Sequence, residues 1–187
     1  MKKSKIFIAI AMLLLCLVML AGCSSTTDYT SSTGSLSYNT NTNTSKTKTL
    51  KLGDTWVVDG QWKLTINSVV STYGRNQFAD TNPEQVVLVT YTYENIGYED
   101  QWGIMDGLYF DLEPWGDATV IDEEGELADS YPGDTSKYPQ ETPVGAKCSN
   151  VQSCIGLTNR SDTITMNISK YDGNGTEHKV TYVLDVD

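Results

Sequence analysis

Histidine is scarce in this chain of 187 residues and occurs only once, as His178. A zinc site usually gathers several His or Cys ligands, and a Ser-His-Asp triad needs a histidine held beside a carboxylate. The sequence therefore predicts no zinc site and no histidine-based catalysis, and a strand-edge position for His178. No other catalytic signature takes their place, so we expect a protein without enzymatic activity.

Basic residues are missing from a long central window. No Lys or Arg occurs between Arg75 and Lys137, whereas 15 acidic residues fall there. Such an acidic surface repels nucleic acid and anionic lipid, so we expect no nucleic-acid partner. Clustered carboxylates offer the oxygen ligands that calcium prefers, but their spacing matches no defined calcium loop. Solvated acidic turns explain the same composition, so calcium is an open alternative and no other cofactor is expected.

Long apolar runs are also rare, and the one at the N-terminus extends from Ile6 to Leu20. At about 1.5 Å per residue this run spans about 22 Å as a helix, short of a hydrocarbon core of about 30 Å. Lys2, Lys3 and Lys5 precede it and small residues end it. These are the parts of a cleavable export signal, and no transmembrane helix is expected after it.

The end of this run, Leu20-Ala21-Gly22-Cys23, resembles the bacterial lipobox. The resemblance implies that residues 1–22 are a lipoprotein signal peptide and that Cys23 becomes an N-terminus carrying a diacylglyceryl group. Two acyl chains suffice for stable anchoring, so we expect the protein at the extracellular face of the cell membrane. The alternative is an ordinary secreted protein in which Cys23 is incidental.

The stretch that follows, residues 23–47, has the composition of a disordered linker. From Ser24 to Thr47, 18 of 24 residues are Ser, Thr or Asn, too few apolar groups to offset the entropy of ordering. Cleavage before Cys23 leaves 10 basic and 24 acidic residues, a formal charge of −14. The remaining length suits one domain, residues 48–187, behind a tether.

Only Cys148 and Cys154 remain in the folded part of the exported chain. In an oxidising compartment two leftover cysteines are more often paired than free, so we favour a disulfide between them. A flat strand would place residues six apart near 20 Å from each other, whereas a disulfide needs Cα atoms within about 7 Å. The bridge therefore requires residues 149–153 to turn. The alternative is two small core residues in one strand.

Alternating apolar and polar residues from Lys48 onward predict an all-β domain. Trp62, Leu64, Ile66 and Ser68 share one face of the clearest strand, which follows a turn at Asp59-Gly60. Further strands are predicted at Gln85 to Asn95, Gly107 to Glu113, Ala118 to Asp122, Glu126 to Ser130, Cys154 to Thr158, Thr163 to Lys170 and Glu177 to Val186. The turn Asp172-Gly173-Asn174-Gly175 predicts a hairpin of the last two. Short strands at this spacing indicate a sandwich or a barrel, and helix should be minor.

Four segments also resemble a family of bacterial immunoglobulin-like domains found on Gram-positive lipoproteins and in a small secreted mycobacterial antigen. They are Leu52-Gly53-Asp54-Thr55, Leu64 to Val69, Val86 to Asn95 and Pro143-Val144-Gly145. The resemblance spans residues 48–187 and implies an immunoglobulin-like, two-sheet antiparallel β-sandwich. It supplies no catalytic residues, and most members have no assigned function. The cysteine pair and the long stretch between Asn95 and Pro143 depart from the family pattern.

Aromatic and acidic residues gather in that long stretch and form the candidate binding surface. They are Tyr98, Trp102, Asp106, Tyr109, Asp111 and Trp115. Exposed aromatic rings beside carboxylates can hold a protein, peptide or glycan partner. The alternative is that Tyr109 or Phe110 and one tryptophan fill the core, as we expect of Trp56 and Trp62. The sequence thus favours a lipid-anchored binding module over a carbohydrate-active hydrolase using paired carboxylates, or a structural accessory subunit of an envelope complex.

Overall fold

The computed structural model describes residues 48–100, 103 and 107–187. The predicted signal peptide (1–22), Cys23 and the predicted linker (23–47) lie outside these residues, as do Trp102 and Asp106 of the candidate binding surface. Within the described part of the chain, no helix has the length and apolar character needed to cross a membrane.

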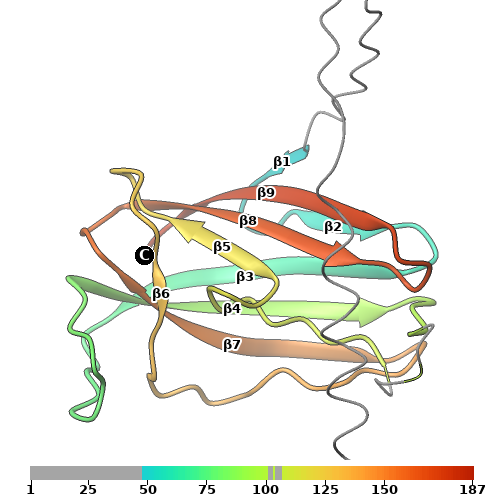
Figure 1. Ribbon diagram of the computed structural model, residues 1–187, viewed down its shortest axis with the longest axis horizontal. Helices are drawn as coiled ribbons and strands as arrows, with labels where there is room; N and C mark the ends of the chain where they lie inside the picture. Colours follow the sequence, from blue (N-terminus) through green and yellow to red (C-terminus); the bar gives the residue numbers. More distant parts are fainter. Residues whose placement is uncertain (1–47, 101–102, 104–106) are drawn as a thin grey trace, which may run out of the picture. The chain divides into compact units, whose positions relative to one another are not determined.

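Nine strands form in the described residues, and they build two sheets (Figure 1). Their bounds are β1 Lys48–Leu50, β2 Thr55–Val58, β3 Trp62–Thr72, β4 Gln85–Asn95, β5 Ala118–Ile121, β6 Asp129–Ser130, β7 Lys147–Leu157, β8 Thr163–Tyr171 and β9 Glu177–Asp185. The four-stranded sheet has the order β1-β9-β8-β5, and the five-stranded sheet has the order β2-β3-β4-β7-β6.

The predicted two-sheet sandwich is confirmed, with one correction to its strand directions. Every strand pair is antiparallel except β1 with β9, which run parallel from Lys48 beside Val180 to Leu50 beside Tyr182. The chain then leaves this sheet and enters the other one at β2. The four-stranded sheet therefore contains both parallel and antiparallel pairs, with the parallel strand β1 at its edge.

The core between the sheets follows the period of two in the sequence. Trp62, Leu64 and Ile66 of β3 are completely buried, as are Ile164, Met166 and Ile168 of β8 apart from about one percent of their surface. Trp56 and Trp62 lie in this core, as predicted, with ring centroids 5.6 Å apart in an edge-to-face arrangement. The predicted hairpin of the last two strands is also confirmed, and so is the turn at Asp59-Gly60 between β2 and β3.

Two β-bulges shift this period and change which residues face the core. The register of β3 against β4 shifts between Ile66 and Ser68. As a result Val69, not Ser68, continues the buried face of β3, and the prediction for Ser68 is wrong. The bulge at Asn67 inserts one residue, and an inserted residue moves every later side chain to the opposite face.

A second bulge, in β7, corrects the disulfide prediction. Cys148 and Cys154 are free thiols on one extended strand, opposite Tyr93 and Leu88 of β4 respectively. Asn150 between them has φ of 54°, and the β4–β7 register shifts there. Without the bulge, residues six apart would share a face. With it, Cys148 joins the core between the sheets and Cys154 joins a second cluster with Val86 and Tyr131.

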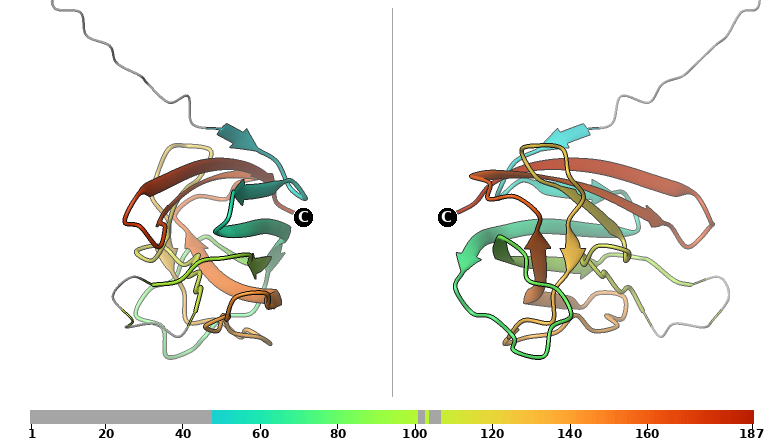
Figure 2. Two further views of the ribbon diagram at one scale, coloured as in Figure 1. Left: turned by 90° about the vertical axis from the view of Figure 1, so that its right-hand side faces the viewer. Right: turned by 60° about the vertical axis from the view of Figure 1, so that its left-hand side comes forward.

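Three predicted strands differ from the structure in extent. The prediction at Cys154 to Thr158 is only the end of β7, which begins at Lys147. The prediction at Glu126 to Ser130 shrinks to the two residues of β6. The segment from Gly107 to Glu113 is not a ladder strand, and a single bridge between Leu108 and Thr142 is its pairing. Figure 2 shows that strand β1 and the green loop between β3 and β4 lie on opposite sides of the domain.

Candidate functional site

The site begins with the segment from Gly107 to Leu112, which inserts side chains between the sheets although it belongs to neither. Leu108, Phe110 and Leu112 are completely buried. Leu108 exchanges two backbone hydrogen bonds with Thr142, with N···O distances of 2.8 and 2.9 Å. The Phe110 ring lies edge-on to Trp62, with centroids 5.8 Å apart. Phe110 is thus a core residue, as the alternative interpretation of this stretch expected.

The residues that alternate with these three are partly exposed: Tyr109, Asp111 and Glu113. The Asp111 carboxylate accepts the amide of Glu113 at 3.0 Å, which fixes the turn that follows. Burial raises the pKa of the Tyr109 phenol, and the charges of Asp111 and Glu113 raise it further. The structure therefore places Tyr109 and Asp111 on one surface.

Trp115 lies at the tip of the turn after this segment. Its side chain is 83% exposed, and its φ of 78° lies in the left-handed region that disfavours bulky residues. The indole Nε1 donates a hydrogen bond of 3.2 Å to Asp129 Oδ1 on β6. One edge of the ring is therefore fixed while its faces remain open to solvent. We call the surface formed by Tyr109, Asp111, Glu113, Trp115 and Asp129 the Trp115 face.

An ion pair underlies the other end of the turn. Lys170 Nζ lies 3.0 Å from both carboxylate oxygens of Asp117, and Asp117 Oδ2 also accepts the amide of Asp111 at 2.9 Å. Burial raises the pKa of Asp117, although Lys170 opposes this shift. Because Asp117 accepts the amide of Asp111, the ion pair fixes the backbone that carries the Trp115 face.

Tyr98 does not join the Trp115 face. Its ring packs edge-on against Trp62, with centroids 6.1 Å apart, at the border of the core. It lines a separate hollow of about 410 Å³ together with Asp117 and Lys170. Of the six predicted binding residues, the structure therefore gathers Tyr109, Asp111 and Trp115, and it places Tyr98 elsewhere.

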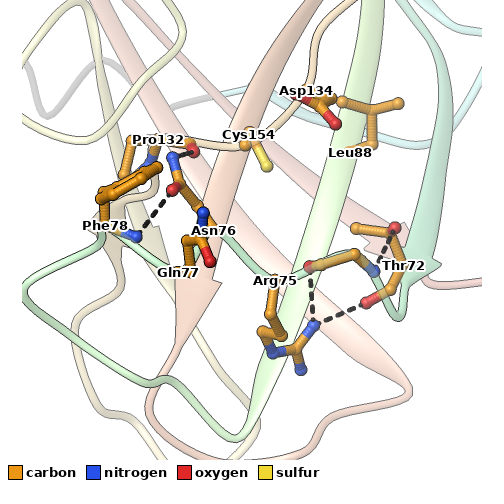
Figure 3. Close-up of a pocket in the computed structure, with 11 residues that line it drawn as sticks. Thr72, Arg75, Asn76, Gln77, Phe78, Leu88, Pro132, Asp134 and Cys154 are labelled. Carbon is orange, nitrogen blue, oxygen red and sulfur yellow. Dashed lines mark hydrogen bonds between the residues drawn. The ribbon is translucent and has the colours of Figure 1, made fainter.

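A second feature, the Cys154 cavity, was not expected from the sequence (Figure 3). It has a volume of about 460 Å³ and lies between the loop after β3 and the segment before β7. Its lining includes Thr72, Arg75, Asn76, Phe78, Leu88, Pro132, Asp134 and Cys154. No motif marks this cavity, because its walls come from four separate segments of the chain.

Asn76 holds the walls of this cavity together. Its side-chain amide donates to Pro132 O at 2.7 Å, and its backbone amide donates to the Tyr131 hydroxyl at 2.8 Å. Its Oδ1 accepts the amide of Phe78 at 2.9 Å. These bonds order the loop, yet the Phe78 ring is left 83% exposed.

The Cys154 thiol lines this cavity in surroundings that disfavour its ionisation. Burial raises the pKa of Cys154, and the charges of Glu113 and Asp134 add to the increase. A nucleophilic cysteine needs the opposite, a lowered pKa and an adjacent base. His178, the one histidine, instead lies 2.9 Å from Asp172, which closes the turn before β9. Its strand-edge position is as predicted.

A third hollow, the Glu113 cavity, adjoins the Trp115 face. It has a volume of about 410 Å³ and shares Asn76, Cys154 and the Pro132–Asp134 segment with the Cys154 cavity. The rest of its wall is formed by Glu113, Ser130, Tyr131, Thr135 and Tyr138. Burial raises the pKa of Glu113, and Asp111 adds to this effect.

In the acidic turn from Asp122 to Glu126, one carboxylate accepts hydrogen bonds that hold the turn together. Asp122 Oδ1 accepts the amides of Glu124 and Glu126, and Oδ2 accepts both the amide and the side-chain nitrogen of Asn159. Among the described residues, no group of three or more His, Cys, Asp or Glu is placed to hold a metal ion. Calcium binding stays a hypothesis for the remaining carboxylates.

No family model matches this chain, and no curated protein matches it. Two solved structures are similar in fold. One is the secreted protein MPT63 from Mycobacterium tuberculosis, with 17% sequence identity and a TM-score of 0.48, over 74% of this chain and 97% of that one. The other is the yjhA protein from Bacillus subtilis, with 13% identity and a TM-score of 0.45, over 73% of this chain and 98% of that one.

Proposed function

We propose that this protein is a lipid-anchored binding module on the extracellular face of a Gram-positive cell membrane. It performs no chemistry of its own, and it holds a protein, peptide or glycan partner through the Trp115 face. The observation that carries this proposal is Trp115 itself, an 83% exposed tryptophan on a strained backbone.

Trp115 contributes little to the stability of the fold in this conformation. A non-glycine residue in the left-handed region costs about 1–2 kcal/mol, and the exposed indole returns little burial in exchange. Its hydrogen bond to Asp129 fixes the ring without covering it. A rigid, flat apolar surface beside carboxylates is what a binding surface provides, because it gains contact area at low entropic cost.

Anchoring follows from the lipobox resemblance at Cys23. A Cys23→Ala variant should leave the detergent phase after export, whereas the parent protein should partition into it, because two acyl chains are needed for stable attachment. Equal partition of the two proteins would contradict the anchor. It would leave the binding surface untouched, since Cys23 is separated from β1 by the Ser/Thr/Asn-rich stretch.

The Trp115 face is tested by photo-crosslinking on intact cells that produce the protein. A photoreactive phenylalanine analogue replaces Trp115 in one variant and Val57 in the control. Val57 is 45% exposed and lies on β2, at the opposite edge of the five-stranded sheet from β6. We expect a discrete crosslinked species from position 115 and none from position 57. Equal crosslinking at both positions, or none at 115, would refute the proposal.

A further inference from the structure

The Glu113 cavity has a pronounced imbalance of charge. Two carboxylates, those of Glu113 and Asp134, line it, and no Lys, Arg or His does. The cavity is continuous with the Trp115 face, because Glu113 belongs to both and Ser130 of its wall follows Asp129. A partner that packs on Trp115 and extends past Glu113 can therefore also reach this cavity.

Neither carboxylate is neutralised within the described part of the protein. The ion pairs found there are Lys63–Glu94, Lys170–Asp117, His178–Asp172 and Lys179–Glu177. Burial raises the pKa of Glu113, which shows that its charged form is held at a cost. Burial raises the pKa of Cys154, and the charges of Glu113 and Asp134 raise it further, while Arg75 of the adjoining Cys154 cavity opposes them. A ligand cation would relieve this cost.

Two uncharged groups of the wall suit the same ligand. Thr135 lines the cavity, and its Oγ1 is buried without a hydrogen-bond partner among the described residues. The Tyr138 ring is 67% exposed and can stack over a cation. Both observations are independent of the two carboxylates, and both are compatible with a cationic side chain in the cavity.

We propose that the Glu113 cavity receives a Lys or Arg side chain from a basic segment of a polypeptide partner, which at the same time packs on Trp115. This inference rests on the proposed function and names the chemistry of the partner. A volume of about 410 Å³ is ample for a guanidinium or ammonium group on its aliphatic stem. The charge of −14 on the exported chain favours encounter with a basic segment over a neutral glycan.

The position of the cavity in the domain leaves it accessible to a partner. It shares Asn76 with the loop after β3, and that loop lies on the side opposite to strand β1 (Figure 2). The chain arrives from Cys23 at β1. A domain tethered at Cys23 can therefore offer this cavity to a partner without its own β1 strand in the way.

The test measures binding of a hexalysine and a hexa-arginine peptide to the exported protein by calorimetry at low ionic strength. The variant is Glu113→Gln, which keeps the shape of the side chain and removes its charge. The matched control is Glu124→Gln, an exposed residue of the acidic turn that loses the same charge. Non-specific attraction depends on net charge and is equal in the two variants, so only a specific site separates them.

We expect Glu113→Gln to weaken binding of either peptide about tenfold and Glu124→Gln to weaken it less than about twofold. Thermal unfolding of both variants establishes that the fold is kept. Equal affinities of the two variants, or no binding by the parent protein, would overturn the inference. Binding of a neutral oligosaccharide that depends on Trp115, with no effect of Glu113→Gln, would also overturn it. That last result, or crosslinking at position 115, would leave the proposed function standing.

Discussion

The paired strands and the segment between β4 and β7 satisfy their backbone groups in different ways. In β3, β4, β7, β8 and β9 the amides and carbonyls bond across ladders of nine to eleven residues per strand. Between residues 96 and 146, the described part of the chain contains only the short strands β5 and β6. Polar side chains of the paired strands supply many of the missing partners there.

Three side chains of β4 bond to backbone groups of this segment in place of a neighbouring strand. The Tyr91 hydroxyl donates to Phe110 O at 3.0 Å, and the Tyr93 hydroxyl accepts the amide of Gln140 at 2.9 Å. Asn95 is completely buried, and its amide nitrogen donates to Tyr98 O and Thr142 O. Because the segment is fastened to the sheet at these points, an irregular backbone can hold Trp115 in a fixed position. Four predictions test how far the two regions are equivalent.

The largest effect is expected from Phe110→Ala. Although Phe110 lies outside the ladders, its ring contacts those of Trp56, Trp62 and Tyr93. We expect a loss of about 3–5 kcal/mol in the free energy of unfolding, as for an aromatic residue in a regular core. Urea denaturation measures it, with Tyr109→Ala as the control, which should cost about 1 kcal/mol or less. Similar losses in both variants would mean that the segment is only peripheral to the core.

A smaller effect is expected from Asn95→Ala. The substitution removes acceptors and donors for four backbone groups, those of Gly97, Tyr98 (both N–H and C=O) and Thr142. The Tyr98 N–H and the Thr142 carbonyl keep second partners, Gln61 O and Leu108 N, so only the Gly97 N–H and the Tyr98 carbonyl are left unpaired. An unpaired buried polar group costs about 1–3 kcal/mol, so we expect a loss of about 3 kcal/mol. Asn67→Ala is the control, because Asn67 is exposed and bonds only to side chains. It should lose less than about 1 kcal/mol in the same urea experiment.

Equal losses in Asn95→Ala and Asn67→Ala would contradict the view that side chains replace the ladder in residues 96–146. Hydrogen exchange gives a second readout. The amide of Gly97 should lose protection in Asn95→Ala, whereas the Tyr98 amide, which also donates to Gln61 O, and the amides of β8 should keep it.

Asp122→Asn tests the same idea through pH. Burial opposes ionisation of Asp122, but hydrogen bonds from Glu126, Asn159 and Glu124 outweigh it and lower the pKa below the ordinary value of 3.8. The stabilisation is therefore fully present above the unfolded-state pKa and is lost as the pH falls through the folded-state value. We expect Asp122→Asn to lose about 1–2 kcal/mol at neutral pH, because Asn retains one acceptor oxygen.

The difference in stability between wild type and Asp122→Asn should be constant above about pH 5 and shrink below about pH 4. Urea midpoints across this range measure it. Glu124→Asn is the control, because it removes an exposed carboxylate from the same turn. A difference that is independent of pH would show that the charge of Asp122 contributes nothing.

The sequence predicted most of the ladder strands, but not the first half of β7, the parallel pairing of β1 with β9 or the site. Alternation predicted the β8–β9 hairpin and the buried face of β3 as far as Ile66, because period two is a property of neighbouring residues. It failed at Ser68 and at the cysteine pair, because a bulge depends on partner strands and leaves no local signal. The Cys154 and Glu113 cavities need Asn76, Glu113 and Pro132 to meet, and their separations in the chain hide this from any pattern.

The smallest effect is expected at Trp115, where the comparison between the two regions is sharpest. At φ of 78° glycine is unstrained and alanine is not, so Trp115→Gly should be more stable than Trp115→Ala by about 1 kcal/mol. In a ladder strand the order reverses, because glycine there costs about 0.5–1 kcal/mol relative to alanine. Exposed Val183 of β9 provides that control, as Val183→Gly and Val183→Ala. Thermal unfolding of the four variants measures both differences. If alanine is the more stable residue at both positions, the backbone at 115 is relaxed in solution, and no stored strain remains to be explained by a binding role.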